Sequence, residues 1–347
     1  NVAVGYKALN AVTTADSNTA IGSGAGEVTV AGSANTIVGY QALNGDVDGD
    51  GADNTALGHK ALHDAVSSTR NTAVGDSAMR GVAGPANGVA NCVAIGANAF
   101  YGSGDNTTID TNGTVAIGKD SLKVLTTGAG NTSVGYISLS ANVGGYYNTA
   151  LGYGTLKTNV SGAANTAVGH EALVVNTGNN NTAVGFASLK ANTSGIQNVG
   201  FGQESLFKNE TANNNTAIGH TAGYWTSGAG NTYVGHGSGL GASGAEANNV
   251  GVGHNSLLAV TTGGNNVAIG KDAAKVMTTG ASNIIIGISA GDAILDSSNH
   301  VLIGAGAGGN GDIANDGQTG VGHLALHALT SGIKNTAVGC QALDATD

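Results

Sequence analysis

One short pattern of polar and apolar positions runs through the whole chain. It reads Asn-Thr-Ala-Val-Gly-x-x-Ala-Leu, followed by a polar stretch, and it returns about every 17 residues, with steps of 16 or 18 also used. A fixed period of this length is typical of solenoids, in which each repeat forms one coil and stacks on the next. Aligned on its glycine, the pattern recurs at Gly5, Gly22, Gly39, Gly58, Gly75, Gly96, Gly118, Gly135, Gly152, Gly169, Gly185, Gly202, Gly219, Gly235, Gly253, Gly270, Gly287, Gly304, Gly322 and Gly339.

Three residues of each repeat alternate as in a short strand. The residue before the glycine is large and apolar, as in Ile21, and the residue two places earlier is β-branched, as in Thr19. Residues two apart share one face of a strand, so we expect this β-branched face to point into the coil. The residue between them, such as Ala20, is mostly Ala or Gly. We expect that column to form a smooth outer face against which another chain can pack.

The other columns are equally regular. Asn heads most repeats, as in Asn18 and Asn35, and Ala, Ser or Thr stands three residues after the glycine, usually followed by Leu. Stacked coils would align the asparagines into a ladder of hydrogen-bonded amides. The alternative, a turn residue that bonds to its own loop, fits equally well.

These columns predict an all-β fold: a parallel β-solenoid, or β-roll, of about 20 coils with a repeat of about 17 residues. We expect one continuous repeat region over 1–347. Longer loop insertions are expected at about 44–53, 80–91 and 101–112, where the step between glycines is long. The chain opens and closes within the pattern, so we expect it to be a segment of a longer protein.

Composition narrows the possibilities. Gly accounts for 60 of the 347 residues, aromatic residues for 4% and charged residues for 10%, so the chain cannot build a thick conventional core. Hydrophobic residues make up 41%, unlike most disordered segments. A net charge of -10 argues against nucleic-acid binding, and no apolar run is long enough to insert into a membrane. Cys92 and Cys340 are expected to be unpaired.

The repeats resemble two groups of known fibrous proteins. Residues 112–118 (Asn-Gly-Thr-Val-Ala-Ile-Gly) and 266–270 (Asn-Val-Ala-Ile-Gly) are similar to the left-handed β-roll heads of trimeric autotransporter adhesins, the YadA-like heads. Residues 35–43 (Asn-Thr-Ile-Val-Gly-Tyr-Gln-Ala-Leu) look like repeats of phage tail-fibre shafts. The resemblance implies a left-handed coil and a homotrimer that packs through small residues. It brings no active site, and the coil here is longer than in the adhesin heads.

Two groups of side chains are candidates for ligand binding. Asp46, Asp48, Asp50 and Asp53 alternate in the first insertion as in a calcium loop, although the glutamate that completes an EF-hand is missing. They are either a weak calcium site or a solvated acidic loop. Histidine follows the repeat glycine in several coils, three of them successive: His59, His170, His220, His236, His254 and His323. They form either an anion or metal column or simply flat side chains at a bend. The other two insertions are polar enough to contact a glycan or protein receptor.

No catalytic motif is present, so we expect no enzyme. The leading hypothesis is a structural fibre or adhesin shaft, extracellular, on a cell surface or a virion, that spaces and presents binding surfaces. Its partners would be other copies of itself, as a homotrimer or a filament. The alternatives are an ice-binding β-solenoid, suggested by the threonine column, and a subunit of a self-assembling extracellular filament.

Overall fold

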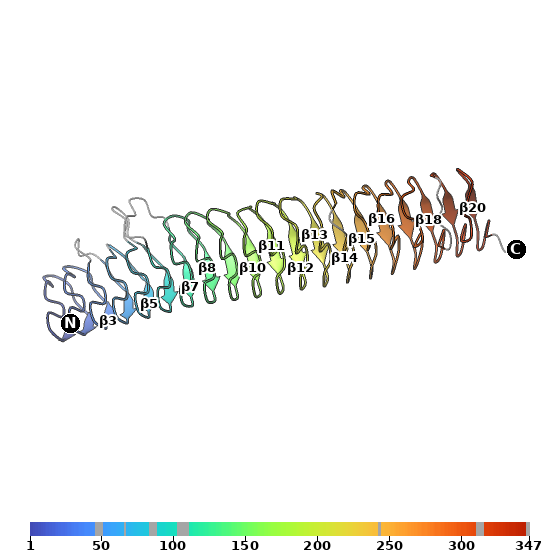
Figure 1. Ribbon diagram of the computed structural model, residues 1–347. Coiled ribbons are helices and arrows are strands. Elements are labelled where there is room, and N and C mark those ends of the chain that lie inside the picture. Colours follow the sequence, from blue (N-terminus) through green and yellow to red (C-terminus); the bar gives the residue numbers. More distant parts are fainter. Residues whose placement is uncertain are drawn as a thin grey trace. The chain divides into compact units, whose positions relative to one another are not determined.

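The protein is an all-β parallel β-solenoid with one short strand per repeat, as the sequence predicts (Figure 1). A computed structural model describes residues 1–45, 51–65, 67–82, 89–102, 111–241, 244–309 and 316–344. The chain forms two compact units, Asn1–Asn179 and Asn180–Asp347. Strands are the only regular elements of the described residues, and none of these residues forms a helix able to cross a membrane.

Every strand is three residues long. The strands of the first unit are β1 (Val2–Val4), β2 (Thr19–Ile21), β3 (Thr36–Val38), β4 (Thr55–Leu57), β5 (Thr72–Val74), β6 (Val93–Ile95), β7 (Val115–Ile117), β8 (Thr132–Val134), β9 (Thr149–Leu151) and β10 (Thr166–Val168). Those of the second unit are β11 (Thr182–Val184), β12 (Val199–Phe201), β13 (Thr216–Ile218), β14 (Thr232–Val234), β15 (Val250–Val252), β16 (Val267–Ile269), β17 (Ile284–Ile286), β18 (Val301–Ile303), β19 (Thr319–Val321) and β20 (Thr336–Val338).

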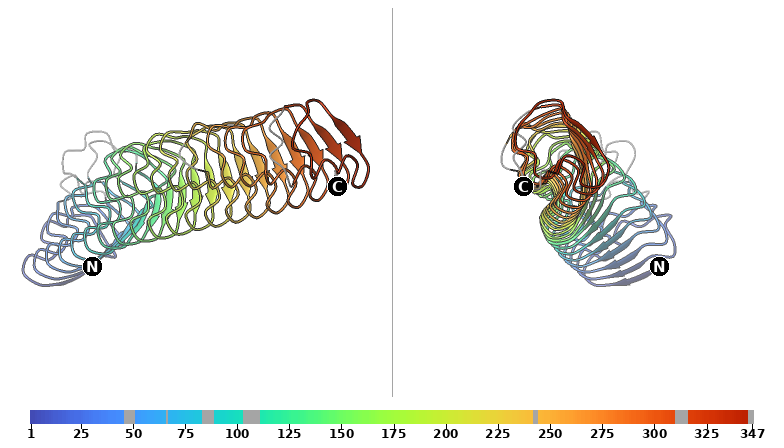
Figure 2. Two further views of the ribbon diagram at one scale, coloured as in Figure 1. Left: turned by 45° about the vertical axis from the view of Figure 1, so that its right-hand side comes forward. Right: turned by 90° about the vertical axis from the view of Figure 1, so that its right-hand side faces the viewer.

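Successive strands within each unit pair in parallel and in register. In the second unit, for example, Thr182 faces Val199 and Ala183 faces Gly200. Each coil therefore lies on the one before it, which the turned views show for both units (Figure 2). Equivalent residues of neighbouring coils thus form columns. Successive residues within a column lie about 4.8 Å apart, the usual spacing of hydrogen-bonded strands.

The direction of the strand side chains is the reverse of the one expected from the sequence. The middle residue of the strand is buried in every coil but the first, as in Ala20 and Ala183, whereas the residues on either side of it are exposed or half-buried. The coil is too thin to hold two rows of branched side chains, because Leu already enters its interior from the opposite side. The Ala and Gly column is therefore core and cannot contact another chain, and the Thr and Val columns form the outer face.

The leucine column fills the interior from a strained backbone. Leu189 and Leu206 are fully buried and have φ angles of 51° and 49°. A left-handed conformation costs a non-glycine residue about 1–2 kcal/mol, so burial of the side chain and a hydrogen bond between coils must offset it. The Leu189 N–H donates to the Ser205 carbonyl oxygen at 2.9 Å.

Core residues compensate for one another in volume. Tyr233 takes the place of alanine in the middle of β14 and is completely buried. Glycine replaces leucine in its own coil at Gly239, and in the preceding coil at Gly223. A Cβ added to Gly239 would lie 2.3 Å from the tyrosine ring. The solenoid thus exchanges small and large residues between two columns and keeps its interior filled.

The asparagine column is a buried ladder between coils. The Asn198 Oδ1 accepts the backbone N–H of Asn215 at 3.0 Å, and its Nδ2 donates to the Ala212 carbonyl oxygen at 2.8 Å. Asn198 in turn donates its backbone N–H to the Asn181 Oδ1 at 3.0 Å. The ladder interpretation of this column is therefore confirmed, with side chain bonded to backbone rather than only amide to amide.

Candidate functional site

The acidic candidates for calcium do not form a described site. Asp46, Asp48 and Asp50 lie outside the described residues. Asp53 is exposed, has a φ angle of 59°, and donates its backbone N–H to the Ser33 carbonyl oxygen at 3.0 Å. Asp53 is thus a turn residue just before the ladder, and calcium binding stays a prediction. The described residues contain no group of three or more His, Cys, Asp or Glu side chains placed to hold a metal ion.

The histidine column is a stack of flat rings. The His220 and His236 rings lie 5.1 Å apart at 14°, and the His236 and His254 rings lie 5.1 Å apart at 10°. Tyr153 stacks on His170 in the same column, at 4.9 Å and 8°. Tyrosine and histidine interchange here, so the column holds any flat side chain at the bend. That arrangement favours the structural interpretation over an anion or metal column.

The outer face of the strands is uncharged in both units and combines threonine with large apolar side chains. None of the twenty strands contains a charged residue, and the Thr and Val columns lie outside the coil. Leu57 in the first unit is 46% exposed, and Phe201 in the second is 54% exposed. The large apolar strand residues that are exposed in this way are Val2, Val4, Ile21, Leu57, Ile95 and Leu151 in the first unit, and Phe201, Ile218, Ile269, Ile284, Ile303 and Val338 in the second. We call these two surfaces the strand faces.

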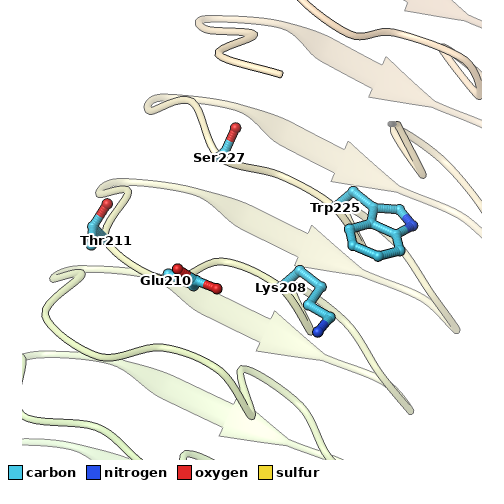
Figure 3. A pocket seen from close by; sticks show the side chains of 5 residues that line it. All are labelled: Lys208, Glu210, Thr211, Trp225 and Ser227. Carbon is cyan, nitrogen blue, oxygen red and sulfur yellow. The ribbon is translucent and has the colours of Figure 1, made fainter. Parts of the chain in front are cut away.

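A groove of about 290 Å³ lies on another side of the second unit, on the polar segments that follow the buried leucine position (Figure 3). Lys208, Glu210 and Thr211 of one coil and Trp225 and Ser227 of the next line it. Trp225 and Lys208 lie at one end, Thr211 and Ser227 at the other, and Glu210 lies between them. We call this surface the Trp225 groove.

An aromatic stack holds one end of the Trp225 groove. Phe207 and Tyr224 occupy equivalent places in their coils and stack at 4.9 Å and 8°. Trp225 meets Tyr224 edge to face at 5.3 Å, and the Lys208 ammonium lies 5.6 Å from the Trp225 ring centre. Neighbouring coils therefore place two aromatic pairs and a cation at one position, which fixes the indole at the surface.

The sites predicted from the sequence do not include the Trp225 groove. Trp225 is the only tryptophan, and the sequence suggested no aromatic platform near an acidic residue. The sequence does contain one indication of this groove: Phe207-Lys208 and Tyr224-Trp225 fall at the same place of successive repeats. Only the stacking of coils brings Glu210 to the same groove as Trp225.

A polar cluster is enclosed inside the second unit. Glu246 stands where most other coils have Gly, Ala or Ser, and it is buried beside Tyr233. The Thr226 Oγ1, the Tyr233 hydroxyl and the Glu246 Oε2 are buried without a hydrogen-bond partner among the described residues. Burial raises the pKa of Glu246 to about 7, since an ionised carboxylate is disfavoured away from water. Burial also raises the pKa of the Tyr233 hydroxyl.

A histidine replaces asparagine in the ladder at one coil. The His300 backbone N–H donates to the Asn283 Oδ1, and its Nδ1 accepts the Gln318 backbone N–H at 3.1 Å. An Nδ1 that accepts must be unprotonated, so the ladder needs neutral His300. Burial lowers the pKa of the His300 imidazole, against the opposing effect of Asp316.

A second, shallow hollow of about 340 Å³ lies in the first unit. It is lined mostly by small residues and carries no charged group: Thr127, Gly128, Ala129, Gly144, Tyr146 and Tyr147. The two tyrosines meet edge to face at 5.3 Å. With few polar side chains to fix a ligand, this hollow has less recognition chemistry than the Trp225 groove.

Comparison with protein-family models and with curated proteins finds no match to this chain.

Proposed function

We propose that this chain is a non-enzymatic structural shaft that associates with further copies of itself through its strand faces. The observation that carries the proposal is the uncharged, exposed row of branched side chains along the strands of each unit. Soluble proteins rarely leave large continuous apolar surfaces uncovered, and those that do use them to bind partners.

A second copy of the chain is the partner that fits this surface. A partner must match side chains that recur at every coil, about 4.8 Å apart, and an identical solenoid has that spacing. Two uncharged faces also meet without burying an unpaired charge, which would oppose association. A homotrimer or a filament would both place strand faces together.

The hydrogen bonds between coils suit a shaft that resists unfolding and proteolysis. Strand pairing, the asparagine ladder and the hydrogen bonds of the leucine column tie each coil to the next at several places around its circumference. Backbone groups tied in this way open together rather than one by one, which protects a shaft against proteolysis. The resemblance to adhesin heads and tail-fibre shafts supports an extracellular place, on a cell or a virion.

The test is the mass of the purified chain in solution, measured by sedimentation at several concentrations. We expect an oligomer, and we expect Ile218→Lys in the second unit and Leu57→Lys in the first to weaken it by at least tenfold in dissociation constant. Val160→Lys is the matched control, because Val160 is as exposed as Leu57 but lies outside the strands. A wild-type chain that stays monomeric at 100 µM, on the order of a weak interface's dissociation constant, refutes self-association.

Ice binding is a second candidate, and the exposure of the threonine column favours it. Thr19, Thr166 and Thr216 lie on the outer face with a large apolar residue two positions on. A flat array of hydroxyl and methyl groups could order water at an ice surface. Thermal hysteresis that is lost in Thr166→Lys and Thr216→Lys would support this role, and its absence in the wild-type chain would exclude it.

A further inference from the structure

We infer that the Trp225 groove binds a neutral saccharide. The groove combines an exposed aromatic face with a carboxylate, an ammonium group and two hydroxyls, all on one surface of the second unit (Figure 3). It lies outside the strands, so the inference goes beyond the proposed self-association and does not depend on it.

Trp225 supplies the apolar contact. Trp225 is 40% exposed, and an edge-to-face contact with Tyr224 and a cation–π contact with Lys208 fix the ring. The next coil has Gly241 at the equivalent place, and that residue adds no side chain over the indole. The C–H face of a sugar ring can lie on such an indole, because an aromatic ring presents a partly negative face to polarised C–H groups.

Glu210 supplies the central acceptor. Its carbonyl oxygen accepts the Thr193 backbone N–H at 2.7 Å, which fixes the main chain at this point. Its carboxylate has no hydrogen bond or ion pair with the part of the chain that the structure describes. An ionised carboxylate accepts strong hydrogen bonds from two neighbouring hydroxyls, the arrangement that a sugar offers.

Lys208, Thr211 and Ser227 complete the recognition. Lys208 donates only, whereas the Thr211 hydroxyl can both donate and accept, so the groove can match the mixed donor and acceptor pattern of sugar hydroxyls. Ser227 already donates to the Gly244 carbonyl oxygen, which leaves its oxygen lone pairs to accept.

Charge and size narrow the ligand class. One carboxylate and one ammonium group balance, which favours an uncharged ligand over an anionic one. A volume of about 290 Å³ lies at the small end of ligand sites, so a short segment of a saccharide fits rather than a folded partner. The groove presents polar groups beside the indole, and this mixture suits a saccharide better than a purely apolar ligand.

The single tryptophan makes the test direct. Indole fluorescence of the full chain reports on Trp225 alone, so maltohexaose, cellohexaose and chitohexaose can each be titrated against it. We expect a saturable change in emission with at least one of the three. No saturable change with any of them up to 10 mM, on the order of the weakest useful affinity, overturns the inference, as does binding of heparin hexasaccharide alone.

Variants then assign the site by calorimetry, which needs no indole. We expect Trp225→Ala to weaken binding at least tenfold, and Glu210→Gln, which keeps the shape of the side chain, to weaken it at least threefold. Tyr153→Ala is the matched control, since Tyr153 is a similarly exposed aromatic residue in the first unit, and it should leave the affinity unchanged. Equal affinity in the wild type and both groove variants overturns the inference. Self-association by sedimentation should be the same in all of them.

Discussion

Replacing Asn198 by alanine tests whether the ladder holds the coils together. The side chain makes three hydrogen bonds: its Oδ1 accepts the Asn215 N–H at 3.0 Å, and its Nδ2 donates to the Ala212 carbonyl oxygen at 2.8 Å and to the Asn181 Oδ1 at 3.2 Å. The Ala212 carbonyl also accepts from Asn209, and the Asn181 Oδ1 also accepts the Asn198 N–H, so both keep a partner. The buried Asn215 N–H is the group left unpaired.

An orphaned buried donor costs about 1–3 kcal/mol, and each further net bond lost costs about 1 kcal/mol. We therefore expect Asn198→Ala to lower the free energy of unfolding by about 3 kcal/mol, which corresponds to a roughly 100-fold change in the opening equilibrium. Hydrogen exchange of the amides in β12 and β13 measures that equilibrium locally, and denaturant unfolding measures it globally.

Asn213→Ala is the matched control. The Asn213 Oδ1 also accepts a backbone N–H from the neighbouring coil, that of Ile196 at 2.8 Å, but in an exposed turn where water can replace it. Its cost should stay below about 1 kcal/mol. Equal losses from the two substitutions would contradict the reasoning, because burial is the property that separates the two asparagines.

Three further predictions concern stability. The pKa of Glu246 is raised to about 7, so the stability that its neutral form contributes is full below the ordinary carboxyl pKa and is lost as pH rises through 7. This loss amounts to up to about 3 kcal/mol in the free energy of unfolding. Glu246→Gln should remove the loss, as measured by unfolding titrations at several pH values. The pKa of His300 is lowered, so the stability that the neutral imidazole contributes is present above the ordinary imidazole pKa and is lost as pH falls through the lowered value. His300→Asn should abolish this sensitivity of the stability to acid. A dependence of stability on pH that is the same in the variant would contradict the role of His300 in the ladder. Gly185 has a φ of 132°, and a Cβ added there would lie 2.5 Å from the Gly202 carbonyl oxygen, so Gly185→Ala should lower the free energy of unfolding by at least about 2 kcal/mol. Gly154→Ala is the control, because its new Cβ would meet nothing closer than 3.8 Å, and in thermal unfolding it should cost clearly less.

Stability of the coil against its neighbours is also a matter of volume. A larger residue in the alanine column is accepted only where the leucine column gives way, as at Tyr233 with Gly239. This coupling joins two columns that are six residues apart in the chain, and it can be found in the sequence once the repeats are aligned. The aligned repeats do not show which of the columns face inward.

The period and the parallel pairing of the strands follow from the amino-acid pattern alone, because a repeated pattern can satisfy its backbone hydrogen bonds by stacking on its own copy. Alternation marked which residues share a face, but it could not say which face is inside. The tertiary structure decided that point, because the interior has a fixed width and Leu189 with its equivalents already fills it, leaving room only for small residues such as Ala183. The Trp225 groove also follows only from the tertiary structure, because its residues belong to two coils and lie together only where these coils stack.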